Sequence, residues 1–284
     1  MVVAATAFGL MAFSAKIACT RLSGPEVAMI RMAVGLLPCI VVPRYRRAAL
    51  HFNRLDLIIY RGFFGGVAVM LYFLAIEHTT AGIATLLNYT APIWSGLFSM
   101  LFIDERISPR VLLPLPVALT GIFLVVNAGT FGFGAWTIVG LSSAIASGAA
   151  VTAMRAARRS ESSWSVYASF CLLGLLVNMP LALRSWKTPN GRDWVALAAT
   201  ATFAMVAQLL LTFSLRWVDA MTVGVISQLA VLISMSLGAL FLGERISGTA
   251  AIGAALTIAG VVGVTYVTSI AKRAAPADEI VPEV

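Results

Sequence analysis

The sequence predicts an all-α polytopic membrane protein with ten transmembrane helices, arranged as two inverted five-helix repeats. Of the 284 residues, 60% are hydrophobic and only 11% are charged, which is too little polar surface for a soluble domain of this length. The hydrophobic residues are gathered in runs long enough to cross about 30 Å of hydrocarbon at about 1.5 Å per residue. One eight-residue pattern also occurs twice, which indicates an internal duplication.

The apolar runs are separated by short breaks rich in glycine, proline, serine or arginine. The first run contains Lys16, lacks a basic leading region and has no small-residue cleavage site, so we expect a membrane helix and not a signal peptide. After residue 270 the chain contains Pro276, Pro282 and mixed charges, which predicts a disordered cytoplasmic tail. The ten candidate helices cover residues 2–20, 25–43, 56–77, 79–103, 109–128, 135–155, 163–183, 194–215, 219–242 and 248–270.

The duplicated pattern sets the spacing of the two repeats. Leu-Phe-Ile-Asp-Glu-Arg-Ile-Ser occupies residues 101–108, and Leu-Phe-Leu-Gly-Glu-Arg-Ile-Ser occupies residues 240–247. The copies lie 139 residues apart, and the same offset pairs Gly121 with Gly260. Two halves that hinge about a central site can expose it to either side of a membrane in turn, as in many secondary transporters. The predicted units are a first five-helix repeat at 1–130, a second at 131–270 and the tail at 271–284.

The distribution of lysine and arginine predicts that both termini lie in the cytoplasm. With that orientation, twelve of these residues fall in cytoplasmic loops and the tail, and five fall on the opposite side. Because each repeat has an odd number of helices, Glu105 and Arg106 lie at the cytoplasmic face, whereas Glu244 and Arg245 lie at the opposite face. The repeat is therefore inverted. We expect a multi-pass protein of the cell inner membrane.

The helix pattern resembles the drug/metabolite transporter superfamily, specifically the EamA type that includes amino-acid and metabolite exporters. The resemblance rests on five helices repeated twice, a proline-containing helix that ends in Glu-Arg, and a glycine-bearing helix after it. The second half has Val231 where the first has Pro92, so a symmetric pair of proline kinks is not predicted. The segments that carry the resemblance are residues 72–76, 88–92, 105–108 with Gly121, and 244–247 with Gly260.

Polar residues in the middle of the candidate helices are the predicted substrate contacts, because such residues are costly in hydrocarbon and transporters of this symmetry bind at the midplane. Asn88 and Tyr89 fall at the same depth as their repeat partners Ser227 and Gln228. For Asn88, bonding between helices is an equally good explanation. The expected contacts are Lys16, Tyr72, Asn88, Tyr89, Trp94, Ser147, Gln208, Ser227 and Gln228.

The proline and the Glu-Arg pairs are predicted to be structural. Pro92 displaces the carbonyl four residues earlier, that of Asn88, and leaves a backbone acceptor near the midplane. A glutamate at a helix end favours the dipole of the next helix, and the serine after it can cap that helix. The structural set is Pro92, Glu105, Arg106, Glu244 and Arg245.

Charge within the candidate helices is cationic. Lys16, Arg31, Arg61 and Arg155 lie inside apolar runs, and no Asp or Glu lies in the middle of one. Each cation is within about six residues of a helix end, so its side chain could extend to the interface. If one of these side chains points inward instead, it favours a substrate that has a carboxylate. The small multidrug relatives of the superfamily depend on a glutamate in their first helix, and this chain has Lys16 there, which argues against a cationic-drug antiporter.

The sequence favours a transporter over an enzyme. Hydrolytic or transfer chemistry needs a nucleophile with a base, a metal set or paired carboxylates, and the two histidines, His51 and His78, are predicted on opposite sides. No phosphate-binding loop is present, so we expect gradient-driven or facilitated transport. We expect no metal, no cofactor and no nucleic-acid partner, and we expect the three cysteines to be packing residues.

The expected function is secondary export of small metabolites by alternating access, with amino acids as the leading substrate class. Export of nucleotide-type metabolites or drugs is the alternative. The expected partners are a small-molecule substrate and the lipid bilayer. The sequence does not decide the coupling ion or the oligomeric state, and a monomer is compatible with it.

Overall fold

The computed structural model describes residues 1–49, 52–103, 113–127, 134–157, 160–214 and 226–274, and these residues form helices and no β-strand. Within these ranges six helices are long and apolar enough to cross a membrane, and α1, α7 and α12 are shorter apolar helices. The predicted class, an all-α polytopic membrane protein, is confirmed. The helices are α1 (Val2–Ala18), α2 (Gly24–Val41), α3 (Pro43–Ala49), α4 (Leu55–His78), α5 (Ala81–Asn88), α6 (Ala91–Ile103), α7 (Pro114–Asn127), α8 (Ala135–Ala157), α9 (Ser163–Arg184), α10 (Gly191–Ser214), α12 (Leu229–Phe241) and α13 (Gly248–Ala274).

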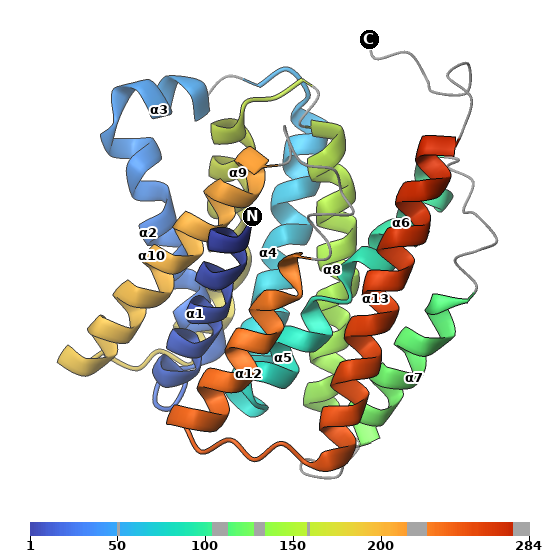
Figure 1. The fold of residues 1–284 in the computed structure, drawn as a ribbon. Helices are drawn as coiled ribbons and strands as arrows, with labels where there is room; N and C mark the ends of the chain where they lie inside the picture. The colour runs from blue at the N-terminus through green and yellow to red at the C-terminus, as the bar shows by residue number, and fades with distance from the viewer. Residues whose placement is uncertain (50–51, 104–112, 128–133, 158–159, 215–225, 275–284) are drawn as a thin grey trace.

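The long helices run side by side between the two ends of a bundle (Figure 1). Helices α1, α2, α9 and α10 lie on one side, α7 and α13 lie on the other, and α4, α5, α8 and α12 lie between them. Helices from early and late in the chain pack directly on one another: α4 contacts α8 and α9, α1 contacts α10 and α12, and α7 contacts α13. The interior of the bundle is therefore built from both halves of the sequence.

Short polar side chains cap the N-termini of several of these helices at the breaks between apolar runs. Ser23 caps α2 by accepting a hydrogen bond from the N–H of Glu26, and Thr80 caps α5 in the same way through Ile83. Ser162 caps α9. Each oxygen satisfies one of the amide groups that have no partner within the first turn of a helix. The breaks thus end one helix and start the next with little unsatisfied backbone.

One predicted segment, 79–103, is two helices. Helix α5 ends at Asn88 and α6 starts at Ala91, because Pro92 has no N–H to continue the ladder. The chain turns through tighter bonds, with Thr90 N–H donating to the carbonyl of Leu87 at 3.1 Å. A second break lies at Gln228, directly before α12, although Val231 stands where the first half has proline. Two breaks therefore exist at positions 139 residues apart, and only one of them has a proline.

Helices α7 and α13 approach closely through glycine. A Cβ atom added at Gly260 would lie 2.5 Å from the Cα of Ala118, and one at Gly121 would lie 2.7 Å from the carbonyl oxygen of Gly253. Real side chains cannot occupy such positions, so only glycine allows this packing. The residues that the repeat offset pairs, Gly121 and Gly260, thus face the same interface from opposite helices.

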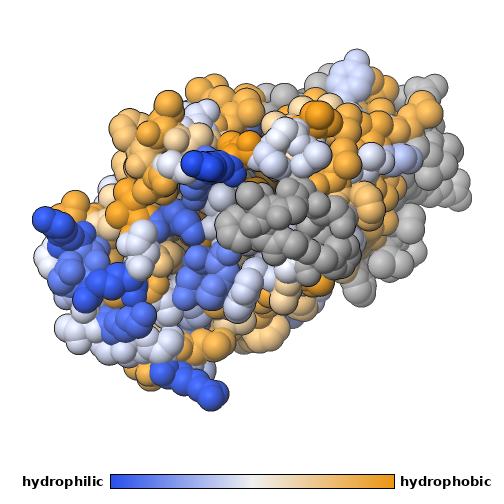
Figure 2. Space-filling model, turned by 90° about the horizontal axis from the view of Figure 1, so that it is seen from below, coloured by the Kyte–Doolittle hydropathy of each residue, from blue (hydrophilic) through white to orange (hydrophobic). Residues whose placement is uncertain are grey.

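Large apolar side chains cover the outside of the bundle. On α4, Ile59 and Phe63 are 50% and 49% exposed, and on α9, Leu172 and Leu176 are 51% and 50% exposed. Each pair is four residues apart and so lies on one face of its helix. Viewed from the lower end of Figure 1, the surface carries hydrophobic residues over wide areas and a hydrophilic region at one side (Figure 2). The apolar faces suit contact with lipid.

Candidate functional site

A polar cluster lies where α5 ends. The side-chain amide of Asn88 donates hydrogen bonds of 3.0 Å to both Ser143 Oγ and Ser147 Oγ, two hydroxyls one turn apart on α8. Ser143 donates in turn to the carbonyl of Gly140. Asn88 and Ser147 are half-buried, whereas Ser143 is fully buried. The structure thus brings together two residues predicted as substrate contacts, and it adds Ser143 to them.

The second break touches the first. The side-chain amide of Gln228 donates to the main-chain carbonyl of Tyr89 at 3.3 Å. The ring of Tyr89 packs edge-on against Phe8 of α1, with centroids 6.4 Å apart. A carbonyl released by a helix break needs a donor, and a glutamine side chain from the other half of the chain supplies it. Tyr89 and Gln228, predicted as repeat partners, are in direct contact.

Aromatic and hydroxyl groups extend the cluster. The hydroxyl of Tyr72 lies 2.8 Å from Thr85 Oγ1, and Trp94 Nε1 donates to Thr90 Oγ1 at 3.3 Å. The first contact joins α4 to α5, and the second joins α6 to the break between α5 and α6. Gln208 is buried in α10 and Ser227 is half-buried before α12, and the part of the chain that is described holds no hydrogen-bond partner for either side chain. Their roles as substrate contacts remain predictions.

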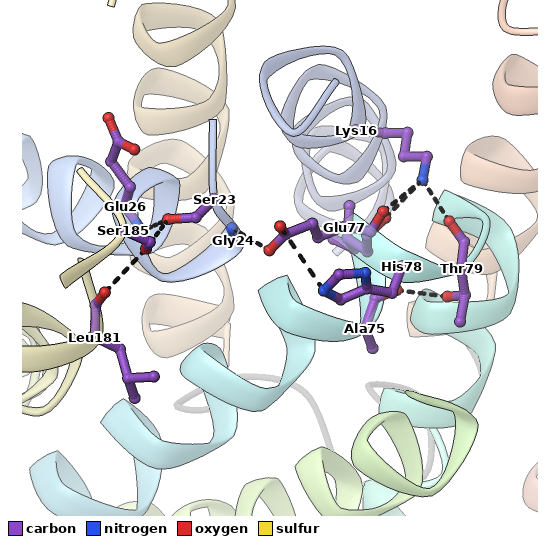
Figure 3. A network of polar contacts seen from close by, with 11 residues as sticks. Lys16, Ser23, Gly24, Glu26, Ala75, Glu77, His78, Thr79, Leu181 and Ser185 are labelled. Atoms are coloured by element: carbon purple, nitrogen blue, oxygen red, sulfur yellow. Dashed lines mark hydrogen bonds and ion pairs between the residues drawn. The ribbon is translucent and has the colours of Figure 1, made fainter. Parts of the chain in front are cut away.

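Lys16 lies at one end of the bundle, with its ammonium group at the end of α4. Lys16 Nζ donates to the carbonyls of Ile76 at 2.8 Å, Glu77 at 3.3 Å and Thr79 at 2.5 Å (Figure 3). An ammonium group has three donors, and all three are used. These carbonyls end a helix, where cations are favoured by the dipole. The contacts of Lys16 give it a structural role; a substrate role stays a prediction.

Carboxylates occupy neighbouring helix starts. Glu77 Oε2 accepts a 2.7 Å hydrogen bond from the N–H of Gly24 at the start of α2, and its other oxygen lies 3.8 Å from His78 Nε2 (Figure 3). Glu244 Oε1 accepts a 3.0 Å bond from the N–H of Ala81 at the start of α5. We call Lys16, Glu77 and Glu244 the end network. It joins α1, α2, α4 and α5 to the loop after α12.

Glu244 and Ser247 serve the starts of two different helices. Glu244 accepts from the N–H of Ala81 at the start of α5, and Ser247 caps α13 through the N–H of Ala250. Gly243, with φ +63°, adopts the left-handed conformation that turns the chain toward α5. Burial raises the pKa of the Glu244 carboxyl, against the opposing effects of the Ala81 bond and Lys16.

The other residues predicted to be structural are Pro92, Arg245, Glu105 and Arg106. Pro92 stands in the first turn of α6, where its missing N–H does no harm, and Arg245 is exposed. Glu105 and Arg106 lie outside the described residues. The capping role of the first Glu-Arg pair therefore stays a prediction.

Two buried arginines were not among the predicted site residues. Arg31 on α2 and Arg61 on α4 are 6% and 5% exposed. Arg31 Cζ lies 5.5 Å from the ring centroid of Phe73 and 5.8 Å from that of Phe170, and Arg61 Cζ lies 4.5 Å from the Phe170 ring. A signal existed in the sequence, since Gly65 stands one turn after Arg61. A Cβ atom there would overlap Arg61 Nη1, so glycine leaves room for the guanidinium.

Groups suited to metal binding are not gathered in the described residues: no three of their His, Cys, Asp or Glu side chains lie together. The three cysteines, Cys19, Cys39 and Cys171, are free and buried. The site must therefore be described by its amides, hydroxyls, aromatic rings and arginines.

An all-helical bundle with lipid-suited faces, broken helices and polar groups at the breaks defines the class of polytopic membrane transporters. The EamA-like transporter family matches residues 1–127 and 134–266, and the chain belongs to this family. The resemblance to the drug/metabolite transporter superfamily is thereby confirmed. The protein is a membrane-embedded transporter of small molecules.

Named relatives agree with that assignment, and a solved structure shares the fold. The chain is 28% identical to the pseudopaline exporter CntI of Pseudomonas aeruginosa, over 91% of this chain and 89% of the relative. It is 27% identical to an uncharacterized transporter of Archaeoglobus fulgidus, over 70% of this chain and 72% of that protein. A crystal structure with 21% sequence identity superimposes with a TM-score of 0.66 over 95% of this chain and 97% of the other, and it shows the same fold.

Proposed function

We propose that this protein is an inner-membrane secondary transporter that exports small metabolites, with amino acids as the leading substrate class. It works by alternating access, with ten transmembrane helices in two inverted five-helix repeats at 1–130 and 131–270, and with both termini and the tail in the cytoplasm. Membership of the family supports the transport activity, and the two matched segments, 1–127 and 134–266, support the division into halves.

The observation that carries the proposal is the meeting of two helix breaks. The Asn88 amide bridges to the two serines of α8, and Gln228 reaches the carbonyl of Tyr89 from the other half of the chain. Broken helices in the interior are where transporters of this kind bind substrate, because they expose backbone and amide groups in a protected place. Amide donors, hydroxyls and an aromatic wall suit the amino and carboxylate groups of an amino acid.

The contact between the breaks also suits alternating access. Asn88 and Tyr89 belong to the proposed first repeat, and Gln228 belongs to the second. A rocking motion of one half against the other would separate the Gln228 amide from the Tyr89 carbonyl and release both groups for a substrate. A single hydrogen bond of this kind is weak, about 0.6 kcal/mol on average between membrane helices, so it does not lock the two halves together.

Export is supported by the relative from Pseudomonas aeruginosa, whose name describes an exporter of pseudopaline. Nucleotide-type metabolites and drugs are the alternative cargo. The cationic interior argues against cationic drugs, since Arg31 and Arg61 are buried.

The test is transport by the purified protein in proteoliposomes. Labelled amino acids, nucleotide derivatives and cationic dyes are offered in parallel, and the appearance of any chemically altered product is monitored. We expect saturable amino-acid flux and no product. Dye transport without amino-acid flux would overturn the choice of substrate, and product formation without flux would overturn the transporter mechanism.

A further inference from the structure

Two guanidinium groups approach one aromatic ring from different helices. Arg31 comes from α2, Arg61 from α4 and Phe170 from α9, and both arginine side chains lie over that ring at 5.8 Å and 4.5 Å. Because they share one ring, the two guanidinium groups lie close to each other. Two like charges thus share one buried location, which needs an explanation.

Neither arginine has a partner that satisfies it. Across the described residues, neither guanidinium donates a hydrogen bond or forms an ion pair, and Arg61 Nε is buried without any partner. A guanidinium has five N–H donors, and burying it unpaired costs several kcal/mol. Contact with an aromatic face stabilises a guanidinium by only about 0.5 to 2 kcal/mol and uses none of its N–H donors.

Extension to the membrane interface does not explain them. A snorkelling arginine keeps its charged head in water, but these residues are 6% and 5% exposed. Gly65 instead leaves space for Arg61 inside the bundle, next to Phe170. Both heads therefore point into the protein.

We propose that Arg31 and Arg61 together bind two carboxylate groups of the substrate, so that the protein selects dicarboxylate amino acids over neutral ones. The inference rests on the proposed function and names its substrate class. The planar fork of arginine matches a carboxylate with two parallel hydrogen bonds, and two forks match two carboxylates. The rings of Phe73 and Phe170 lie against the two guanidinium groups.

The location joins this anion site to the helix breaks. Arg31 lies over the ring of Phe73, and that ring packs edge-on against Tyr72 with centroids 5.6 Å apart. Tyr72 bonds to Thr85 on α5, and the carbonyl of Tyr89 is held by Gln228. A substrate whose carboxylates sit on the arginines can place its amino group toward the backbone and amide acceptors of the breaks.

The transport test compares glutamate with glutamine, which differ by one carboxylate. In proteoliposomes we expect a lower KM for glutamate in the wild type. Arg31→Gln and Arg61→Gln should raise the glutamate KM about tenfold or more, because each loses charge-assisted hydrogen bonds. They should change the glutamine KM less than about twofold, because the neutral amide makes no such bonds. Arg46→Gln, an exposed arginine of α3, is the matched control and should change neither.

Equal effects of the two variants on the KM values for glutamate and glutamine, with transport intact, would overturn the anion site and leave the proposed function standing.

A second measurement does not depend on transport. Glutarate, but not glutaramide, should raise the unfolding temperature of the wild type in detergent. Glutarate should not change the unfolding temperature of Arg31→Lys, Arg31→Gln or Arg61→Gln. The lysine variant keeps the charge but loses the planar fork of donors.

No glutarate effect on the wild type, or the same effect on every variant, would overturn the anion site. Stabilisation by glutarate without flux of either amino acid would instead support the anion site and contradict amino-acid transport.

Discussion

The end network and the buried arginine pair handle charge in opposite ways. In the end network, Lys16 uses all its donors on carbonyls, and Glu77 and Glu244 each accept from a helix start. In the interior, Arg31 and Arg61 meet only aromatic rings among the described residues. Paired charges hold helices in place, whereas buried charges with unused donors are expensive and are kept for a ligand.

The largest expected effect is at Lys16. Lys16→Met should lower the free energy of unfolding in detergent by about 2 kcal/mol, because the substitution leaves three helix-end carbonyls without their charged donor. Chemical or thermal unfolding measures it. Arg46→Met, at an exposed arginine of α3, is the control and should be neutral. Unchanged stability together with a raised KM would make Lys16 a substrate contact, as the sequence predicts.

Asn88 tests the polar cluster at the end of α5, whose side chains are uncharged. Asn88→Leu should lower kcat/KM about tenfold, which corresponds to about 1.4 kcal/mol, because the substrate loses an amide group at the helix break. The loss of stability should stay below about 1.7 kcal/mol, the most seen for hydrogen bonds between membrane helices. Proteoliposome kinetics and unfolding are measured on the same preparation.

Thr265→Val is the matched control for Asn88, because the Thr265 hydroxyl bonds only within α13. Wild-type kinetics in Asn88→Leu with reduced stability would show that the Asn88 bonds to Ser143 and Ser147 only join α5 to α8.

Glu244 should give a smaller effect. Glu244→Ala removes one of the two side-chain acceptors at the start of α5, the other being Thr80, and should lower the free energy of unfolding by about 1 kcal/mol, the usual size for a helix cap. Glu244→Gln keeps an acceptor for the Ala81 N–H and should restore most of the loss. If alanine and glutamine behave alike, the bond to Ala81 does not stabilise the protein.

The pH dependence of the same residue is the smallest expected effect. Burial raises the pKa of Glu244 above its ordinary value of 4.5. The folded protein therefore holds this proton more tightly than the unfolded chain, so the contribution is fully present below pH 4.5 and is lost as pH rises through the folded pKa. The unfolding temperature of the wild type, relative to Glu244→Gln, should fall as pH rises from 4.5 toward neutral. A rise would mean that the folded pKa is depressed.

The sequence was sufficient for features that depend on local pattern and on the repeat spacing. Apolar runs predicted the helical class, and the offset of 139 residues singled out Tyr89 and Gln228, which touch. Ser147 and Asn88 were both predicted as polar residues in the middle of apolar runs, and the two are bonded. Side-chain direction and depth follow from position along a helix, so the pattern could indicate residues that lie together; their contact with substrate stays a prediction.

The sequence could not show contacts that depend on packing between distant segments. The bond from Ala81 to Glu244 joins residues 163 apart in sequence, and nothing local indicates it. The break at Gln228 occurs without a proline, so no residue type in the sequence predicts it. Arg31 and Arg61 look like residues that can extend to the interface, and only the packing of α2, α4 and α9 shows that they are buried.

The most direct test of the central claim compares the unfolding temperatures of Arg61→Met and Lys16→Met in the same detergent without substrate. Both variants remove one cation. If Arg61 is an unpaired charge kept for a ligand, Arg61→Met should be at least as stable as the wild type, since an apolar side chain replaces a buried charge. Lys16→Met should be less stable. A loss at Arg61→Met as large as that at Lys16→Met would contradict the account.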